Sequence, residues 1–204
     1  SLDEEHYEQC FNTRTRMVAM THVSNVLGSV LPVERLVATA KRHGVPVLID
    51  GAQAVAHFPV DMQKIDADFY VFSAHKLFAP TGIGVVYVKR SLRDRMDVYQ
   101  TGGSMIEKVT FAETTFAPCP TRYEAGTPHI AGAIALAQAC RYIQTIGFDA
   151  IASYEDKLYQ QLLAICNDFP RLHLYGRATK KIPLASFTYQ GAHPHDIATI
   201  MDSV

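Results

Sequence analysis

The sequence predicts an α/β fold in which helices cover both faces of a β-sheet. Three short runs, at 45–50, 68–73 and 84–88, are apolar without regular polar alternation, which is typical of strands that are buried on both sides. A segment with the periodicity of an amphipathic helix, 32–43, precedes the first run. Strand and helix patterns therefore follow one another along the chain, which indicates an α/β sheet.

The chain before the first of these runs is predicted as helix, strand, loop and helix. Residues 3–11 have a helical pattern, 17–21 form a short apolar strand, and 22–29 are a polar loop. Pro32 begins the next helix at a position where its missing N–H costs nothing, and Gly44 ends that helix. The predicted buried face of the helix consists of Val33, Leu36, Val37 and Ala40.

The stretch 98–128 is predicted as a long loop because glycine and proline recur through it. Structureless loops of this length are uncommon unless they have a function. The stretch 129–146 that follows is apolar and rich in alanine. We predict that it is a buried helix.

Residues 148–204 predict the start of a second, smaller α+β domain. The expected elements are a helix at 148–168, strands at 172–175 and 184–188, and a helix at 196–204. The apolar stripe of the first helix consists of Ile151, Tyr154, Leu158, Leu162 and Ile165. The predicted organisation is therefore a partial large domain at 1–147 and a truncated small domain at 148–204.

Composition narrows the classes of function. The 204 residues carry 19 basic and 20 acidic side chains, for a net charge of −1, and no basic run suggests binding to nucleic acid or to a membrane surface. No apolar stretch approaches the roughly 18–20 residues that cross a bilayer. The four cysteines are widely scattered, which predicts reduced thiols in a cytoplasmic protein. Since the chain lacks an initiator methionine, we expect an internal fragment of a longer enzyme.

Two predicted strands end in residues that can do chemistry. Asp50 closes the run 45–50, and Ser73-Ala74-His75-Lys76 closes the run 68–73. Ligands of open α/β sheets bind beyond the carboxyl ends of the strands. Taken alone, such an aspartate is usually a turn or cap residue and a lone lysine is usually solvated. Lys76 differs because it lies between an apolar strand and a Gly/Pro turn that leads into another apolar strand.

An amine and a carboxylate at adjacent strand ends suit pyridoxal 5'-phosphate (PLP). The cofactor needs a lysine amine for its aldehyde and an acidic partner for its pyridine nitrogen. Lys76 and Asp50 can supply these groups. Gln53 could donate to the phenolic oxygen of the ring, and Ser73 and His75 could reach the phosphate.

Six segments then make a family resemblance specific. They are 21–28 (THVSNVLG), 50–53 (DGAQ), 73–77 (SAHKL), 80–84 (PTGIG), 102–106 (GGSMI) and 123–128 (YEAGTP). In this order and spacing they resemble the class V, fold-type I PLP-dependent aminotransferases, and among them the SufS-type (group II) cysteine desulfurases. Ala74 stands where the family often has glycine, and Phe78 and Ala79 stand where Tyr-Gly is frequent; these changes are conservative in size.

The resemblance implies a three-layer fold-type I PLP-dependent transferase domain, present in part, followed by the start of the small domain. It implies that Lys76 is the Schiff-base lysine and acid/base catalyst, and that Asp50 contacts the pyridinium. The other implied roles are Gln53 at the phenolic oxygen, Ser73 and His75 at the phosphate, Asn25 at the substrate carboxylate, and Gly126 and Thr127 at the phosphate of a neighbouring subunit in a homodimer.

The implied activity is the conversion of L-cysteine to L-alanine, with the sulfur kept as an enzyme persulfide and passed to an acceptor protein of iron–sulfur cluster assembly. The family's nucleophilic cysteine lies in a later loop, and its ring-stacking histidine and a phosphate-binding threonine lie upstream. We therefore expect the fragment itself to be inactive. Cys119, in a Pro-flanked loop, is the only candidate substitute among the four cysteines.

Other functions stay open from the sequence alone. Another class V enzyme, such as a selenocysteine lyase, an epimerase or an aminotransferase, would share the PLP residues. A folded but inactive module would share them too. A metal site is not predicted, because His193 and His195 flank Pro194 without a third ligand.

Overall fold

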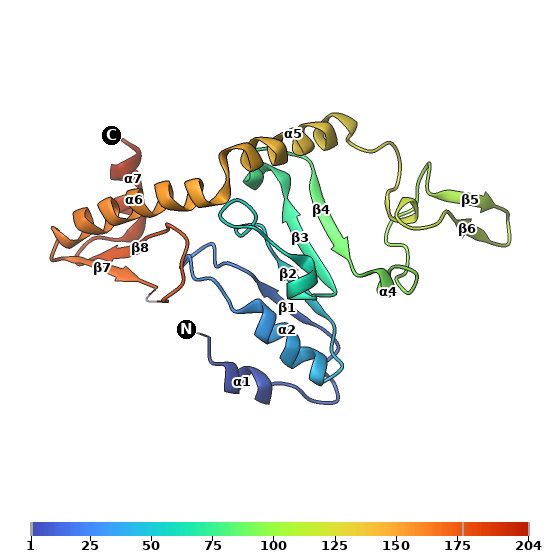
Figure 1. Ribbon diagram of the computed structural model, residues 1–204, viewed down its shortest axis with the longest axis horizontal. Helices are drawn as coiled ribbons and strands as arrows, with labels where there is room; N and C mark the ends of the chain where they lie inside the picture. Colours follow the sequence, from blue (N-terminus) through green and yellow to red (C-terminus); the bar gives the residue numbers. More distant parts are fainter. Residues whose placement is uncertain (1, 177, 204) are drawn as a thin grey trace.

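The computed structural model describes residues 2–176 and 178–203 and is built on a four-stranded sheet (Figure 1). Its strands, in spatial order, are β1 (Val18–Thr21), β2 (Val47–Asp50), β3 (Phe69–Ser73) and β4 (Gly84–Val88). The first three are parallel, and β4 runs antiparallel to β3. The predicted α/β class is thus confirmed, and the parallel strands end at a common edge.

Seven α-helices and two short 3₁₀ helices are found among the described residues. The α-helices are α1 (Glu4–Gln9), α2 (Val33–Arg42), α3 (Met62–Ile65), α4 (Arg90–Arg93), α5 (Ile130–Ile146), α6 (Phe148–Asn167) and α7 (Pro194–Asp202). The 3₁₀ helices are η1 (Ala74–Leu77) and η2 (Thr121–Tyr123). In Figure 1, α5 crosses the ends of β3 and β4, and α6 continues from it towards the hairpin of β7 (Leu172–Tyr175) and β8 (Ser186–Tyr189).

The amphipathic helix α2 packs as its periodicity predicts. All four residues of its apolar face are buried: Val33, Leu36, Val37 and Ala40. Val33, Val37 and Ala40 join buried side chains of β2, including Val47 and Ile49, in one hydrophobic cluster. Gly44 follows the helix with a φ of +69°, the left-handed conformation in which glycine is favoured.

The segment 98–128 is not the structureless loop that its composition predicts. It contains an antiparallel hairpin, β5 (Ile106–Val109) paired with β6 (Thr114–Phe116), which extends away from the main sheet (Figure 1). The hydroxyl of Thr110 fixes the turn by accepting hydrogen bonds from the N–H groups of Ala112 (3.3 Å) and Glu113 (3.0 Å). Because β5 is exposed on both sides, it has no buried face to impose an alternating pattern.

The prediction of a buried helix at 129–146 was wrong about burial. The helix α5 is present, but only Gly132, Ala139 and Ile143 are buried, while Ile134 and Tyr142 are 68% and 60% exposed. Of the apolar stripe predicted for α6, only Ile151 packs against the hydrophobic cluster. Its other four residues are exposed: Tyr154, Leu158, Leu162 and Ile165. An apolar composition therefore indicated the helices correctly without locating their packing partners.

Helix α6 contacts the hairpin β7–β8, and these C-terminal elements are called the smaller unit. The strand predicted at 184–188 begins at Ser186, because Leu184 packs against the cluster around Val23 and Ala54. The helix predicted at 196–204 begins at Pro194, and the ring of its cap residue His193 accepts a hydrogen bond from the N–H of His195. Among the described residues, no helix has both the length and the hydropathy needed to cross a membrane.

Candidate active site

The residues predicted to do chemistry lie on adjacent elements at the carboxyl edge of the sheet. In the register of the parallel strands, Asp50 is opposite Thr21 on one side and Val71 on the other. Ser73 ends β3 two positions beyond Val71, and η1 follows at once with His75 and Lys76. A ligand of an open α/β sheet is expected at this edge.

Asp50 is held by its backbone while its side chain stays exposed. Its carbonyl accepts a hydrogen bond from the N–H of His22 at 2.7 Å, and the N–H of Gly51 donates to the carbonyl of Val71 at 2.8 Å. One carboxylate oxygen accepts from the N–H of Ala52 at 2.9 Å. The carboxylate is therefore oriented by its own turn and can still reach a ligand.

Lys76 lies on a short helix that is anchored on both sides of it. Ala74 and Leu77 are buried, whereas His75 is exposed and Lys76 is half-buried. The N–H of Ala74 donates to the carbonyl of Ile83, and the N–H of Ala79 donates to the carbonyl of Ala74. The methyl group of Ala74 is fully enclosed, so alanine fits here in place of the more common glycine.

Helix α5 braces the turn that follows Lys76. The ring of His129 caps α5 by accepting a hydrogen bond from the N–H of Gly132 at 3.2 Å. A Cβ atom on Gly82 would lie 3.5 Å from the same ring. The start of α5 therefore rests on the segment Pro80–Gly84 that connects η1 to β4.

His22 and Tyr70 form a buried pair next to Asp50, and sequence patterns gave no indication of Tyr70. The Nδ1 atom of His22 is 3.0 Å from the hydroxyl of Tyr70. Burial, and secondarily the positive charge of Lys180, lowers the pKa of His22 to about 4. Burial, and secondarily the negative charge of Asp50, raises the pKa of Tyr70 well above its ordinary value. Both side chains are therefore neutral at neutral pH.

Asn25 and Gln53 occupy the loops that follow β1 and β2. Asn25 is exposed, in a loop where the hydroxyl of Ser24 accepts from the N–H groups of Val26 (3.2 Å) and Leu27 (3.0 Å). Gln53 is half-buried in the turn after Asp50. Both residues thus belong to the same edge of the sheet as the aspartate.

The Asn25 loop is also held from the smaller unit. The N–H of Ile182 donates to the carbonyl of Gly28 at 2.9 Å, and the N–H of Val30 donates to the carbonyl of Lys180 at 3.0 Å. The hydroxyl of Ser186 contacts the carbonyl of Val26. Residues about 150 positions apart in the sequence therefore fix this loop together.

Gly126 and Thr127 are separate from the other predicted site residues. They lie between η2 and α5, outside the four-stranded sheet. Gly126 has a φ of +82°, and its N–H donates to the carbonyl of Gly103 at 2.8 Å. These features give the turn a defined shape.

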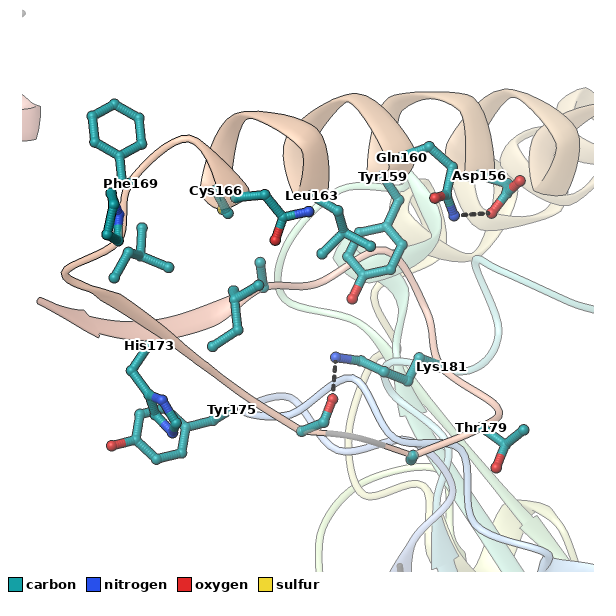
Figure 2. Close-up of a pocket in the computed structure, with 17 residues that line it drawn as sticks. Asp156, Tyr159, Gln160, Leu163, Cys166, Phe169, His173, Tyr175, Thr179 and Lys181 are labelled. Carbon is teal, nitrogen blue, oxygen red and sulfur yellow. Dashed lines mark hydrogen bonds between the residues drawn. The ribbon is translucent and has the colours of Figure 1, made fainter.

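Two cavities are lined by neither Asp50 nor Lys76. One, of about 670 Å³, is between α6 and the chain around β7. Figure 2 shows Lys181 there, with its ammonium donating to the carbonyl of Gly176 at 2.9 Å. The other, of about 750 Å³, adjoins His22 and the start of α2. Among the described residues, no group of three His, Cys, Asp or Glu side chains is placed to hold a metal ion.

Comparison with known proteins agrees with this architecture. The family model "Aminotransferase class-V" matches residues 1–204. The chain is 45% identical over 204 residues to a cysteine desulfurase of Enterobacter sp. (strain 638), covering 100% of this chain and 50% of the relative. It is 44% identical over 201 residues to a cysteine desulfurase of Synechococcus elongatus, covering 98% of this chain and 32% of the relative.

Solved structures give the same result in three dimensions. An apo cysteine desulfurase of Thermococcus onnurineus NA1 superposes with a TM-score of 0.92 at 37% identity, over 100% of this chain and 51% of that one. A cysteine desulfurase of Escherichia coli superposes with a TM-score of 0.92 at 33% identity, over 98% and 50% of the two chains. The chain thus spans at most about half the length of these relatives, which agrees with the predicted partial fold.

Proposed function

The chain belongs to the class V aminotransferase family, and from this premise we propose that the protein containing it is a PLP-dependent cysteine desulfurase. The observation that carries the proposal is the parallel pairing of β2 with β3. This pairing brings the end of the strand that carries Asp50 next to the strand that leads into Lys76. A carboxylate and an amine from neighbouring strand ends are the donor set that PLP requires.

When bound, PLP supplies an electron sink that stabilises negative charge at the substrate Cα. In the proposal, Asp50 faces the ring nitrogen and its negative charge keeps that nitrogen protonated. Lys76 would hold the cofactor through its aldehyde carbon. The amine of Lys76 would also move a proton at the substrate Cα.

Four further residues complete the proposed site. Ser73 and His75, on either side of the buried Ala74, bind the phosphate. Gln53 donates to the phenolic oxygen of the ring, and Asn25 helps to hold the substrate carboxylate. The supporting observation is their common location. Asn25, Gln53 and His75 follow β1, β2 and β3, and Ser73 ends β3, all at the same edge of the sheet.

The proposed substrate is L-cysteine and the products are L-alanine and an enzyme persulfide. The substrate C–S bond breaks, an S–S bond to an enzyme thiol forms, and a proton completes the alanine methyl group. Cys140 and Cys166 lie within helices α5 and α6, and Cys10 follows α1. Cys119 lies between β6 and η2, outside the four-stranded sheet that carries Asp50 and leads into Lys76. As the family resemblance implies, we place the accepting thiol in the part of the relatives' length that this chain does not span.

The decisive experiment locates the cofactor lysine. In the full-length protein loaded with PLP, borohydride reduction should leave the cofactor covalently attached to the peptide that contains Lys76. Lys76→Ala should abolish the attachment, the visible absorption band of the bound cofactor and alanine formation from L-cysteine. The exposed Lys157→Ala variant is the control. Attachment to another lysine, or a normal band in Lys76→Ala, would contradict the proposal.

We further propose a cytoplasmic homodimer of the SufS-type subgroup that passes sulfur to an acceptor protein of iron–sulfur cluster assembly. Gly126 and Thr127 reach the phosphate site of the neighbouring subunit. Their location outside the four-stranded sheet, in a turn of defined shape, supports this role.

Subunit complementation tests the shared site. A heterodimer of one Lys76→Ala subunit and one Thr127→Ala subunit holds one intact site if Thr127 acts across the interface. It should recover about half of the wild-type activity, although each parent homodimer is impaired. If Thr127 acts within its own subunit, the heterodimer has no intact site, and the absence of recovery would exclude the shared arrangement.

A further inference from the structure

The turn that follows Asp50 is closed on one side by an aromatic ring. A Cβ atom on Gly51 would lie 2.0 Å from Cε1 and 2.1 Å from the hydroxyl oxygen of Tyr70. No side chain can share that space, because real Cβ contacts do not come so close. Glycine is thus required here by the position of Tyr70, and the ring fixes the path of the Asp50–Gly51–Ala52 backbone.

The position of Tyr70 depends in turn on His22. The two side chains meet at 3.0 Å between Nδ1 and the hydroxyl, although they are 48 positions apart in the sequence. Tyr70 is 2% exposed and His22 is 7% exposed. A hydrogen bond between two buried polar groups holds both in place, since breaking it would leave each without a partner.

His22 also acts on Asp50 through its own backbone. Its N–H donates to the carbonyl of Asp50 at 2.7 Å, so one residue fixes both the end of β2 and the ring above Gly51. The imidazole of His22 packs edge-on against the ring of Phe58, with 5.2 Å between the ring centroids. Phe58 lies at the end of the segment that begins at Gly51. One end of this segment therefore packs against His22, and His22 in turn holds the other end through Asp50.

We propose that His22 and Tyr70 are positioning residues for Asp50. They hold the turn after Asp50 so that its carboxylate points out of the sheet edge, towards the ring nitrogen of the cofactor. This inference rests on the proposed function, in which Asp50 contacts that nitrogen. The two residues act through Asp50 and Gly51 rather than by touching the cofactor.

The charge state of the pair suits this role. Burial keeps His22 neutral, with a pKa of about 4, and burial together with Asp50 keeps the Tyr70 phenol protonated. The neighbouring ionised groups are Lys180, whose positive charge acts on His22, and Asp50, whose negative charge acts on Tyr70. A neutral pair neither repels nor neutralises the carboxylate that it holds.

The test uses full-length protein and two readouts besides activity: the dissociation constant for PLP, and the pH midpoint of the visible absorption transition of the bound cofactor. Tyr70→Phe keeps the ring and removes the hydroxyl, and His22→Leu removes the hydrogen-bonding partner of that hydroxyl. Each should weaken PLP binding about fivefold, the effect of one hydrogen bond, and move the absorption midpoint in the same direction as Asp50→Asn. His22→Asn places an amide near the position of Nδ1 and should restore part of the loss.

Controls separate positioning from general stability and from the proposed function itself. Ile65→Ala removes a buried side chain of α3 in the hydrophobic cluster to which Tyr70 belongs and should lower the melting temperature without moving the absorption midpoint. If Tyr70→Phe and His22→Leu behave like Ile65→Ala while Asp50→Asn moves the midpoint, the positioning role is overturned and the proposed function stands. If Asp50→Asn moves neither readout, the positioning role and the proposed function are both overturned.

Discussion

The imidazole of His57 lies 2.8 Å from one carboxylate oxygen of Glu155 and 2.9 Å from the other. His57 belongs to the segment that follows Asp50, and Glu155 belongs to α6. The contact therefore joins the turn at the candidate active site to the long helix of the smaller unit.

We predict that this pair contributes a favourable interaction energy between the turn after Asp50 and helix α6. The side chains are only 20% and 27% exposed, so solvent screens their interaction less than that of a surface pair. A double-mutant cycle with His57→Ala and Glu155→Ala should give a coupling of about 1 kcal/mol in urea unfolding. The exposed pair Arg42–Glu8 is the control and should give a smaller coupling, because solvent screens it more strongly. Equal values for the two pairs would contradict the prediction.

His22 should make stability depend on pH. Its pKa is about 4 in the folded protein and 6.5 as an ordinary histidine, so only the unfolded chain binds the proton between these values. The free energy of unfolding should fall as the pH drops from about 6.5 to 4, with a total loss of about 3 kcal/mol. Below about pH 4 His22 should cause no further loss, because the folded protein then binds the proton as well.

The measurement is the pH profile of the free energy of unfolding, taken as the difference between wild type and variant. His22→Asn should flatten the profile between pH 6.5 and 4. His173→Asn, at an exposed position in β7, is the control and should leave the slope unchanged. A parallel profile for His22→Asn would show that this histidine is not the source of the dependence.

Replacing Gly28 should lower the free energy of unfolding by more than its left-handed conformation alone accounts for. Its φ is +69°, and a Cβ atom there would lie 3.0 Å from the carbonyl oxygen of Ile182 and 3.1 Å from Cβ of Leu184. Gly44 has the same φ, with no described atom within 4 Å of its Cβ position. It is therefore a matched control in which only the backbone cost is present.

We expect Gly44→Ala to cost about 1 kcal/mol, which is the price of a left-handed alanine, and Gly28→Ala to cost about 2–3 kcal/mol because crowding adds to it. Chemical unfolding of both variants measures the difference. Equal losses would show that the segment around Ile182 yields to the added methyl group, and that the Asn25 loop is held less tightly than the contacts indicate.

The two long helices should tolerate polar substitution on one face only. Ile143 in α5 is 3% exposed, so Ile143→Ala should cost about 2–4 kcal/mol through lost burial and a cavity. Tyr154 and Ile165 in α6 are 63% and 57% exposed. Replacing either with serine should change the unfolding free energy of this chain by about 0.5 kcal/mol or less. A large loss at Ile165 would mean that α6 packs differently from the structure.

Local sequence patterns were sufficient for most elements of the sheet. The strand predicted at 84–88 has those bounds in the structure, and α2 buries the four residues that its periodicity indicated. The hairpin β5–β6 escaped prediction because its strands are exposed, and exposed strands have no apolar alternation to detect. The openness of α5 and α6 escaped it because composition does not reveal what a helix packs against.

The sequence by itself determined that a carboxylate and an amine close two successive apolar strands, because a strand and the turn after it depend on residues that are neighbours in the chain. Only the tertiary structure decided that these strands pair in parallel, that Tyr70 fills the space over Gly51, and that residues 180–186 return to hold the Asn25 loop. Such contacts join positions from about 20 to 160 apart. These long-range contacts depend on strand register and side-chain packing. Neither register nor packing can be read from a local sequence pattern.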